Sequence, residues 1–268
     1  MAYITSIGLY VPEWTSFNVG LFILGICLCL SAVATETLEP TPYSKFGNRL
    51  VDTIPTRWAM LAMYLPSLLV CALPFDHPHW PFSRFEWIHT ITFLHFFKRL
   101  IEVIWVHRYS GKTNIVTTVI ISSTYTATSF FDLLVVSRMP SSVFSFGWGL
   151  AGLILVIVGE TTNGYHHYLL RQLRKDIVDT KSSTSSAYRL PRGGLFEYAV
   201  APHYFAEQLT YLGLIFLSQN VVSLSIKFFP MIYLTLRAAR THEWYYDNLL
   251  KSEKILLASR KRLIPFVW

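Results

Sequence analysis

Long apolar runs separated by short polar stretches are the dominant pattern of this sequence. Crossing a bilayer takes about 20 mostly apolar residues, and such a run must be helical because lipid offers no partners to backbone groups. The candidate spans are 17–34, 57–75, 86–106, 115–137, 143–168, 197–218 and 221–238. Pro66, Pro202 and Pro230 lie within three of these runs; neighbouring helices or a polar cavity would satisfy the backbone groups that they free. The pattern therefore predicts an all-α integral membrane protein of seven transmembrane helices.

Composition supports the membrane assignment. The chain of 268 residues is 52% hydrophobic and only 15% charged, whereas soluble domains carry about 25% charged residues. The net charge of +7 does not predict nucleic-acid binding, because the basic residues lie in short loops between apolar runs. Cys27, Cys29 and Cys71 all lie within apolar segments and have neither disulfide nor zinc spacing. No Lys or Arg precedes Lys45, so we expect the first run to be a retained helix and not a signal peptide.

The distribution of basic residues predicts the orientation. Nearly all loop Lys and Arg residues lie in 35–56, 107–114, 169–196 and the tail from 239, while the opposite side has only Arg84 and Arg138. Basic loops stay in the cytosol, so we expect a lumenal N-terminus and a cytosolic C-terminus. We expect a single domain over 1–268, with a cytosolic loop at 169–196 and a tail at 239–268 lying on the membrane surface.

Ionisable residues inside the third run suggest a site. His95, Lys98 and Arg99, and Glu102 follow at spacings of three and four residues, which place them along one helical stripe. Such groups are costly in lipid and are a functional hypothesis by default. The alternative is a helix end whose basic side chains reach the cytosolic surface, although this explains Glu102 poorly.

Two further segments carry polar groups near the same side. Glu160, Asn163, His166 and His167 end the fifth run; this spacing is weak for a metal site, so we expect a hydrogen-bonded lining and no metal. The stretch 188–207 starts as a basic loop with glycines and continues into a helix that carries His203, Tyr204 and Glu207. A polar clasp between helices is the alternative for these three residues. Asp132 and Lys227 are single groups of ambiguous role.

A basic rim is expected at the cytosolic mouth of the bundle. Its members are Arg171, Arg174, Arg189, Arg192, Arg237 and Arg240. Clustered arginines suit a pyrophosphate or an adenosine phosphate. No GxGxxG follows a strand and there is no Walker motif, which excludes a soluble nucleotide-binding fold. The residues thus predict a cytosol-facing cavity with an anionic cofactor or lipid at its mouth.

In the segments that carry these polar and basic residues, the chain resembles the steroid 5α-reductase family of membrane reductases, which includes polyprenol and very-long-chain enoyl-CoA reductases. The resemblance runs from about residue 42 to the end, through pieces that occur in the same order. They are TPYSKFG, a proline-bearing helix at 57–75, LHFFKRLIEVIWVHR, YHHYLLRQLRK, YRLPRGGLFEYAVAPHYFAE, and a terminal block with His242, Trp244, Tyr245 and RLIPFVW.

The resemblance implies a seven-helix domain, expected in the endoplasmic reticulum, that holds NADPH in a cytosol-facing cavity with a lipophilic substrate above it. In this family hydride goes to the β-carbon of an activated double bond while a donor polarises the carbonyl. The positions that match the family's cofactor site are Asn163, Arg171, Arg174, Tyr188, Arg189, His203, Glu207, Arg237, His242 and Tyr245.

The chain departs from the steroid reductases on the substrate side. A Gln-Glu pair of those enzymes, whose Glu holds the steroid carbonyl, corresponds to Met63 and Tyr64, and a Tyr of theirs corresponds to Phe96. Lys98, Arg99 and Glu102 instead resemble a polar triplet of the enoyl-CoA reductases, and Tyr204 falls at the proton-donating tyrosine of that branch. The resemblance therefore implies Tyr204 or Tyr64 as proton donor, with Lys98 and Arg99 lowering its pKa or binding phosphate and Glu102 holding them.

Three functions remain open from the sequence. The first is NADPH-dependent reduction of a C=C bond in a lipophilic enone, enal or enoyl substrate of steroid, isoprenoid or acyl type. The second is isomerisation or cyclisation of a terpenoid or polyketide-like substrate on the same scaffold, with NADPH structural or absent. The third is a non-catalytic lipid-binding protein. Partners are expected to be a lipophilic small molecule and membrane lipids, without nucleic acid.

Overall fold

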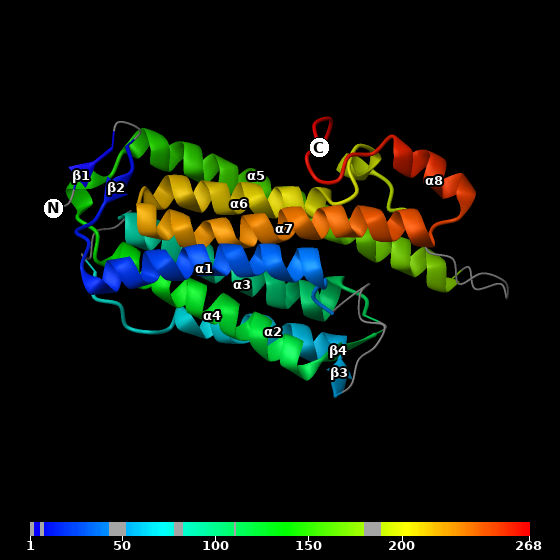
Figure 1. Ribbon diagram of the computed structural model, residues 1–268, viewed down its shortest axis with the longest axis horizontal. Helices are drawn as coiled ribbons and strands as arrows, with labels where there is room; N and C mark the ends of the chain where they lie inside the picture. Colours follow the sequence, from blue (N-terminus) through cyan, green and yellow to red (C-terminus); the bar gives the residue numbers. More distant parts are fainter. Residues whose placement is uncertain (1–2, 6–7, 43–51, 78–82, 110, 180–188) are drawn as a thin grey trace.

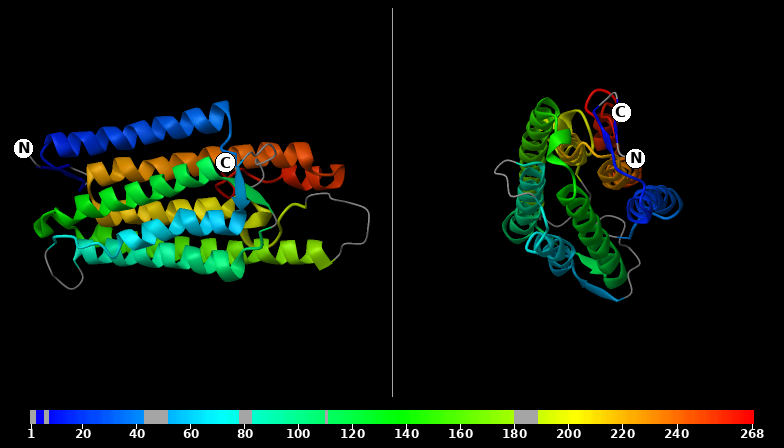
Figure 2. Two further views of the ribbon diagram at one scale, coloured as in Figure 1. Left: turned by 90° about the horizontal axis from the view of Figure 1, so that it is seen from below. Right: turned by 90° about the vertical axis from the view of Figure 1, so that its left-hand side faces the viewer.

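The computed structural model describes the chain except residues 1–2, 6–7, 43–51, 78–82, 110 and 180–188. The helices are α1 Ser16–Leu38, α2 Thr56–Val70, α3 Arg84–Ile101, α4 Ile115–Ser137, α5 Phe146–Asp179, α6 Pro202–Ser218, α7 Val221–Asn248 and α8 Lys251–Ala258. Short 3₁₀ segments occupy Ser141–Val143 and Gly194–Glu197, and a π-helical turn, Glu102–Val106, continues α3. Helices α1 to α7 run lengthwise beside one another (Figures 1 and 2).

Two small antiparallel sheets mark the ends of the bundle (Figure 1). Strands β1 (Tyr3–Ile4) and β2 (Tyr10–Val11) pair with Tyr3 opposite Val11. Strands β3 (Thr53–Pro55) and β4 (Lys112–Asn114) pair with Thr53 opposite Asn114. The second pair joins the start of α2 to the start of α4. We call these the β1–β2 end and the β3–β4 end.

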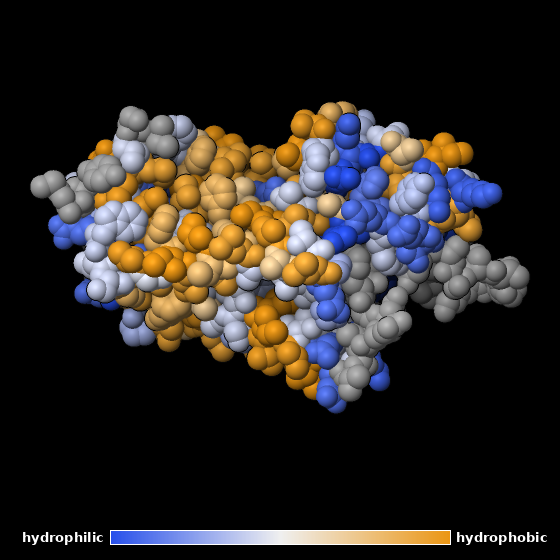
Figure 3. Space-filling view, viewed as in Figure 1, coloured by the Kyte–Doolittle hydropathy of each residue, from blue (hydrophilic) through white to orange (hydrophobic). Residues whose placement is uncertain are grey.

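The apolar character of the helices fits a membrane protein. Among the described residues, four helices are long and apolar enough to span a bilayer: Ser16–Leu38, Ile115–Ser137, Phe146–Arg174 and Val221–Asn248. Hydrophobic side chains cover the middle of the visible face, and hydrophilic ones gather near α8 (Figure 3). Helices α2, α3 and α6 are shorter, and the full count of seven spans remains a prediction.

Some boundaries differ from those expected. The fifth helix continues to Asp179, so residues 169–179 are helical where a loop was expected, and Arg171 and Arg174 lie on a helix. Polar residues after Tyr168 end the apolar run but not the helix, because Leu, Arg, Gln and Lys are good helix formers. Similarly, α7 continues to Asn248 through residues assigned to the tail. Helix α6 begins only at Pro202, as proline suits the first helical turn.

Side-chain caps fix several helix starts. The Asn114 side chain accepts a hydrogen bond from Thr117 N at 3.1 Å, and Ser83 Oγ accepts one from Glu86 N at 3.2 Å. Asn220 Oδ1 accepts from Val222 N at 2.8 Å. Each cap satisfies a backbone donor that the first helical turn leaves unpaired.

Glycines let α5 and α6 approach closely. A Cβ on Gly213 would lie 2.5 Å from the backbone oxygen of Gly152, and one on Gly159 would lie 2.6 Å from Ala206 O. Small residues at such positions are typical of helix pairs in membranes. A glycine also allows a close approach between α1 and α7, where a Cβ on Gly25 would lie 2.5 Å from Ser225 Oγ.

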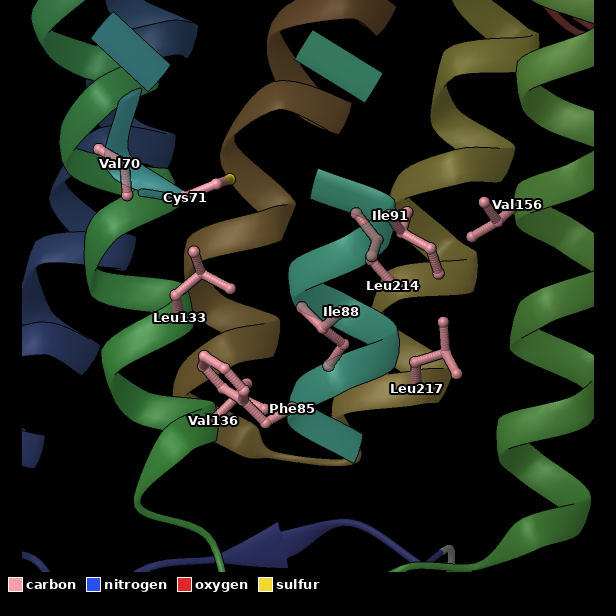
Figure 4. Close-up of a cluster of buried hydrophobic side chains, with 10 residues drawn as sticks. All are labelled: Val70, Cys71, Phe85, Ile88, Ile91, Leu133, Val136, Val156, Leu214 and Leu217. Atoms are coloured by element: carbon pink, nitrogen blue, oxygen red, sulfur yellow. The ribbon is translucent and has the colours of Figure 1, made fainter. Parts of the chain in front are cut away.

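The apolar core lies around α3. Phe85, Ile88 and Ile91 of α3 are buried with Leu133 of α4 and Leu214 of α6, and Figure 4 shows the α3 side chains between those two helices. This core is adjacent, along α3, to the polar residues that follow Phe96. The apolar core therefore fixes the position of α3, the helix that carries the candidate site.

Candidate active site

A buried polar network surrounds the C-terminal turns of α3. Arg99 and Glu102 are 8% and 4% exposed, and the helix passes into its π-helical turn at Glu102. Such turns are frequent at functional sites because they redirect side chains. The stripe predicted from sequence spacing therefore exists, and it faces other helices instead of the cytosolic surface.

Arg99 links α3 to α2. Its Nη1 donates to Glu102 Oε2 at 2.8 Å, and its Nη2 donates to the phenol oxygen of Tyr64 at 2.7 Å. The guanidinium carbon also lies 4.9 Å from the centre of the Tyr64 ring. A cation held beside a phenol stabilises negative charge on that oxygen. The contact favours Tyr64 as a polarised proton donor.

Lys98 links α3 to α5. Its Nζ donates to Glu160 Oε2 and to Asn163 Oδ1, both at 2.8 Å, and lies 3.5 Å from Glu102 Oε1. Glu160 also pairs with His95, whose Nδ1 lies 2.7 Å from Glu160 Oε1. The cations and carboxylates thus compensate one another, which buried charges require.

His167 completes the network at a position that resembles a metal site. Its Nδ1 lies 2.9 Å from Glu102 Oε2, and ligand atoms of Glu102, His107 and His167 all lie within 4.8 Å of one another. However, Arg99 Nη1 lies 3.2 Å from the same His167 nitrogen and donates to the same Glu102 oxygen. A guanidinium therefore already provides the positive charge there, and the geometry favours the hydrogen-bonded lining over a metal centre.

A cavity of about 60 Å³ borders this network between α3, α4, α6 and α7. His95, Phe96, Tyr125 and Tyr211 are among its lining residues. Tyr64 packs just behind it, because its ring centre lies 5.8 Å from that of Tyr125 and 6.5 Å from that of Phe96. An apolar lining with a few polar groups is the usual chemistry of a small-molecule site, whose volume is about 300 Å³ or more, so this cavity would have to widen to admit a lipophilic ligand.

Helix α6 directs its candidate residues to two different faces. Asn163 Nδ2 donates to the backbone oxygen of His203 at 3.0 Å, and the His203 ring lies 5.8 Å from that of His167. Tyr204 instead packs in an apolar cluster with Ala238 of α7 and Leu263 of the tail, with its ring 4.3 Å from that of His203. Sequence reasoning did not foresee this separation of neighbouring residues, which follows from the turn of 100° per residue in a helix.

Glu207 lies on the network side of α6. It is buried and close enough to Arg99 for their charges to interact. This position is compatible with support of Arg99.

Four arginines of the expected basic rim are exposed or partly exposed. Arg174 of α5 donates to the backbone oxygen of Arg108; Arg189 is exposed, and Arg192 Nη2 lies 3.2 Å from Glu253 Oε1 of α8. Arg171 is partly exposed on the same helix as Arg174. Tyr188 lies outside the described residues.

Arg237 and Arg240 lie apart from that rim and bind α1. Arg237, 1% exposed, pairs with Glu36 at 3.3 Å and donates to Thr41 O at 3.0 Å. Arg240 donates to the backbone oxygens of Glu36 and Thr37. The structure thus gives both residues a role in holding α1 to α7, which the apolar first run could not reveal.

The remaining candidates lie near the C-terminal tail. Tyr245 is buried in an apolar cluster with Leu190 and Leu257, and it is close enough to Arg174 and Arg260 for electrostatic interaction. His242 is partly buried on the same helix.

Tyr211 and Arg260 were not among the sequence-based candidates. Tyr211 lines the cavity together with His95, and Glu160 binds both His95 and Lys98. Arg260 closes the loop before α6, donating to Pro191 O and, at 3.1 Å, to Glu197 Oε2; burial lowers the pKa of its guanidinium. The four-residue spacing of His95 to Arg99 was a usable signal, but nothing in the sequence pairs Glu160 with α3.

Comparison with known sequences identifies the relatives of this chain. Residues 112–268 match the family described as 3-oxo-5-alpha-steroid 4-dehydrogenase. The chain belongs to this family. The matched region contains α4 to α8, whereas Tyr64, Lys98 and Arg99 precede it.

Individual members of the 3-oxo-5-alpha-steroid 4-dehydrogenase family show the extent of the similarity. The chain is 36% identical to 3-oxo-5-alpha-steroid 4-dehydrogenase 1 of Rattus norvegicus over 118 residues, which are 44% of this chain and 41% of the relative. It is 33% identical to enzyme 1 of Homo sapiens over 129 residues, 48% of this chain and 43% of the relative. With enzyme 2 of Homo sapiens it shares 27% identity over 251 residues, 90% of this chain and 93% of the relative.

Proposed function

We propose that the protein is a membrane reductase that uses NADPH to reduce an activated C=C bond in a lipophilic substrate. Steroid-like enones are the first class to test, because the relatives are named 3-oxo-5-alpha-steroid 4-dehydrogenases. The observation that carries the proposal is the 2.7 Å hydrogen bond from Arg99 to Tyr64 beside an apolar cavity.

Tyr64 is the group that we assign to the substrate carbonyl. When hydride adds to the β-carbon of an enone, negative charge develops on the carbonyl oxygen. A phenol donating to that oxygen stabilises the charge, and Arg99 behind the phenol strengthens this effect. Glu102 fixes the position of Arg99 through the contact at 2.8 Å, and Lys98 Nζ in turn lies 3.5 Å from the other oxygen of Glu102. Tyr204, the other donor expected from the sequence, packs against Ala238 and Leu263, on a different face of α6 from the one that contacts the network.

His95 offers a second polar group within the cavity itself. Its Nδ1 is held by Glu160, which fixes the orientation of the ring as second-shell carboxylates do. We assign it to positioning the substrate or returning a proton to the α-carbon. The reduction then balances: hydride is added to the β-carbon and a proton to the α-carbon.

The basic rim fits the phosphates of NADPH. Arg189 and Arg192 are exposed, as is Arg174 at the end of α5, and guanidinium groups bind phosphate through paired donors. Asn163, which accepts from Lys98 Nζ at 2.8 Å, and His203 and Glu207 of α6 are the residues that would hold the rest of the cofactor. When bound, NADPH supplies the hydride. The residues of the network exclude water and hold the substrate carbonyl.

The location that we propose is the endoplasmic reticulum membrane, with the N-terminus lumenal and the C-terminus cytosolic. The gathering of hydrophilic side chains near α8 (Figure 3) supports it, since basic segments remain in the cytosol. Protease digestion of sealed microsomes tests this orientation. Cleavage within 180–188 without permeabilisation is expected, and protection of that segment would contradict it.

Purified protein incubated with NADPH and a panel of lipophilic enones, enals and enoyl thioesters tests the reaction. We expect NADPH oxidation, followed at 340 nm, in step with formation of a product two mass units heavier. Product of unchanged mass without NADPH oxidation would support an isomerase or cyclase instead. No product and no nucleotide binding would favour a non-catalytic lipid-binding protein.

A further inference from the structure

Arg84, the first residue of α3, is a buried cation at the β1–β2 end of the bundle. It is 6% exposed. Its Nη1 lies 3.3 Å from Met139 Sδ, and its guanidinium carbon lies 5.2 Å from the centre of the Phe144 ring. Within the part of the chain that the structure describes, its Nε and Nη2 have no hydrogen-bond partner. The proposed reduction does not use this residue, which lies at the opposite end of α3 from Arg99.

The described neighbours of Arg84 provide no negative charge. Tyr10 of β2 is close enough for electrostatic interaction, but a phenol is uncharged at neutral pH. Met139 offers a thioether sulfur, which is only a weak acceptor. A buried charge without a partner is strongly unfavourable, and an ion of opposite sign that hydrogen-bonds to it removes much of the cost. The surroundings of Arg84 therefore favour an anion, since a water molecule would satisfy the N–H groups but not the charge.

The two nitrogens without partners form one edge of the guanidinium group. The N–H groups along that edge are parallel, and they are the pair that binds two oxygens of a single phosphate or carboxylate. Arginine is enriched where such paired recognition occurs. An anion with two acceptor oxygens therefore matches the unpaired edge of Arg84.

The surface around this end of the bundle indicates which anion lies nearby. Trp14, which precedes α1, and Trp148, in the first turn of α5, are 46% and 45% exposed. Exposed tryptophans are enriched at the level of the lipid headgroups, and phosphate is the oxyanion that phospholipids present at that level. Apolar contacts from Met139 and Phe144 also suit the glycerol and acyl parts of a lipid better than a free ion.

We propose that the Nε–Nη2 edge of Arg84 binds a phosphate group at the β1–β2 end of the bundle. A phospholipid headgroup is the favoured source, and free phosphate is the other. Both nitrogens are buried, so binding requires a change of rotamer, which the long unbranched side chains of Arg84 and Met139 permit. The competing role is a structural one, in which Arg84 packs against Phe144 and binds no anion.

Three probes added to the purified protein in a neutral detergent test the inference. They are lauroyl lysophosphatidic acid, lauroylglycerol, which is the same lipid without its phosphate, and inorganic phosphate. Apparent dissociation constants are obtained from the rise of the unfolding temperature with probe concentration. The variants are Arg84→Lys, which keeps the charge but loses the paired donors, and Arg84→Met, which removes the charge. The control is Arg138→Met, which removes an exposed arginine at the same end.

The wild type and the control are expected to be stabilised by lysophosphatidic acid and not by lauroylglycerol. Arg84→Lys should bind the phosphate lipid at least about tenfold more weakly, as expected for loss of a hydrogen bond to a charged group. Arg84→Met should show no rise that depends on phosphate. Without any probe, its unfolding temperature should be no lower than that of the wild type, because it buries no unpaired charge.

The remaining outcomes also decide the inference. Equal stabilisation by inorganic phosphate at the same concentration would support the site and assign it to the free ion. Equal effects of the two lipids on the wild type, no effect of any probe, or a phosphate-dependent rise that is the same in the wild type and Arg84→Lys would overturn it. The comparison with Arg84→Lys is sufficient if Arg84→Met does not fold. The assay contains neither NADPH nor an enone, so its result is independent of the proposed reduction.

Discussion

Arg99 reaches from α3 to α2 and donates through Nη2 to the hydroxyl oxygen of Tyr64 at 2.7 Å. Tyr64 is 4% exposed and lies behind Phe96 and Tyr125 at the edge of the cavity. A phenol held in this way is polarised before substrate binds, which is the condition for stabilising a developing negative charge. This pairing distinguishes the two tyrosines that the sequence left as alternatives.

Tyr64→Phe is expected to lower turnover by at least about 100-fold, because a positioned acid contributes at least that much. NADPH affinity should change little, since the phenol lies behind Phe96 and Tyr125 at the edge of the cavity and is bonded to Arg99 of α3. The matched variant is Tyr204→Phe, which removes the same hydroxyl from the cluster on the other face of α6. Steady-state rates and nucleotide binding of both variants decide the assignment: full loss in Tyr204→Phe with an active Tyr64→Phe would reverse it.

Glu160→Gln is expected to lower both stability and activity. The change leaves His95 without its carboxylate and Lys98 with Glu102 alone, at 3.5 Å, and breaking a buried pair costs about 3 kcal/mol. Thermal unfolding in detergent measures the loss. Glu243→Gln is the control, because its pair with Arg240 is largely exposed and such pairs contribute about 0–1 kcal/mol. Equal unfolding temperatures of the two variants would show that the network does not hold α3 to α5.

Arg174→Gln is expected to raise the KM for NADPH about tenfold, since it removes one charge-assisted contact to phosphate. The kcat at saturating nucleotide should stay close to that of the wild type, because the contact is made equally before and during the reaction. Arg138→Gln provides a control for loss of one positive charge, as Arg138 lies after α4 at the β1–β2 end and stacks on Phe17. A KM for NADPH equal to that of the wild type in Arg174→Gln would show that Arg174 of α5 does not bind the cofactor.

His107 is expected to make stability depend on pH. Burial, together with the nearby charges of His167 and Arg99, lowers the pKa of its imidazole from 6.5 to about 2. A lowered pKa in the folded state means that the contribution to stability is complete above pH 6.5 and is lost as the pH falls below it, by up to about 1.4 kcal/mol per pH unit.

Unfolding temperatures between pH 7.5 and 5.5 test the role of His107. The wild type should lose more stability over this interval than His107→Gln, which has no imidazole to protonate on unfolding. Parallel curves for the two proteins would mean that His107 is not held in its neutral form.

The sequence predicted the helices well because bilayer-length apolar runs have few alternatives. It placed the basic residues after Tyr168 in a loop, since hydropathy reports where an apolar run ends and not where helical hydrogen bonding ends. The stripe of Lys98, Arg99 and Glu102 followed from helical spacing alone. Its partners on α2 and α5 did not, because contacts such as Lys98 with Glu160 depend on how separate helices pack.

The basic residues of α7 show a further limit. Arg237 and Arg240 look like phosphate ligands in the sequence, yet Glu36 and the carbonyls at the end of α1 bind them. Glu36 lies at the end of the first apolar run, where a single acidic residue carries no signal of its partner. Charge in a sequence therefore does not show which arginines are engaged in contacts between helices.

Hydride transfer can be followed directly with NADPH carrying deuterium at the transferred position of the nicotinamide ring. Purified protein, this nucleotide and a 3-oxo-4-ene steroid are expected to give a product with one deuterium at the β-carbon and one NADP⁺ formed per product, as seen by mass spectrometry and NMR. A product of unchanged mass, or a reduced product without deuterium, would contradict the account.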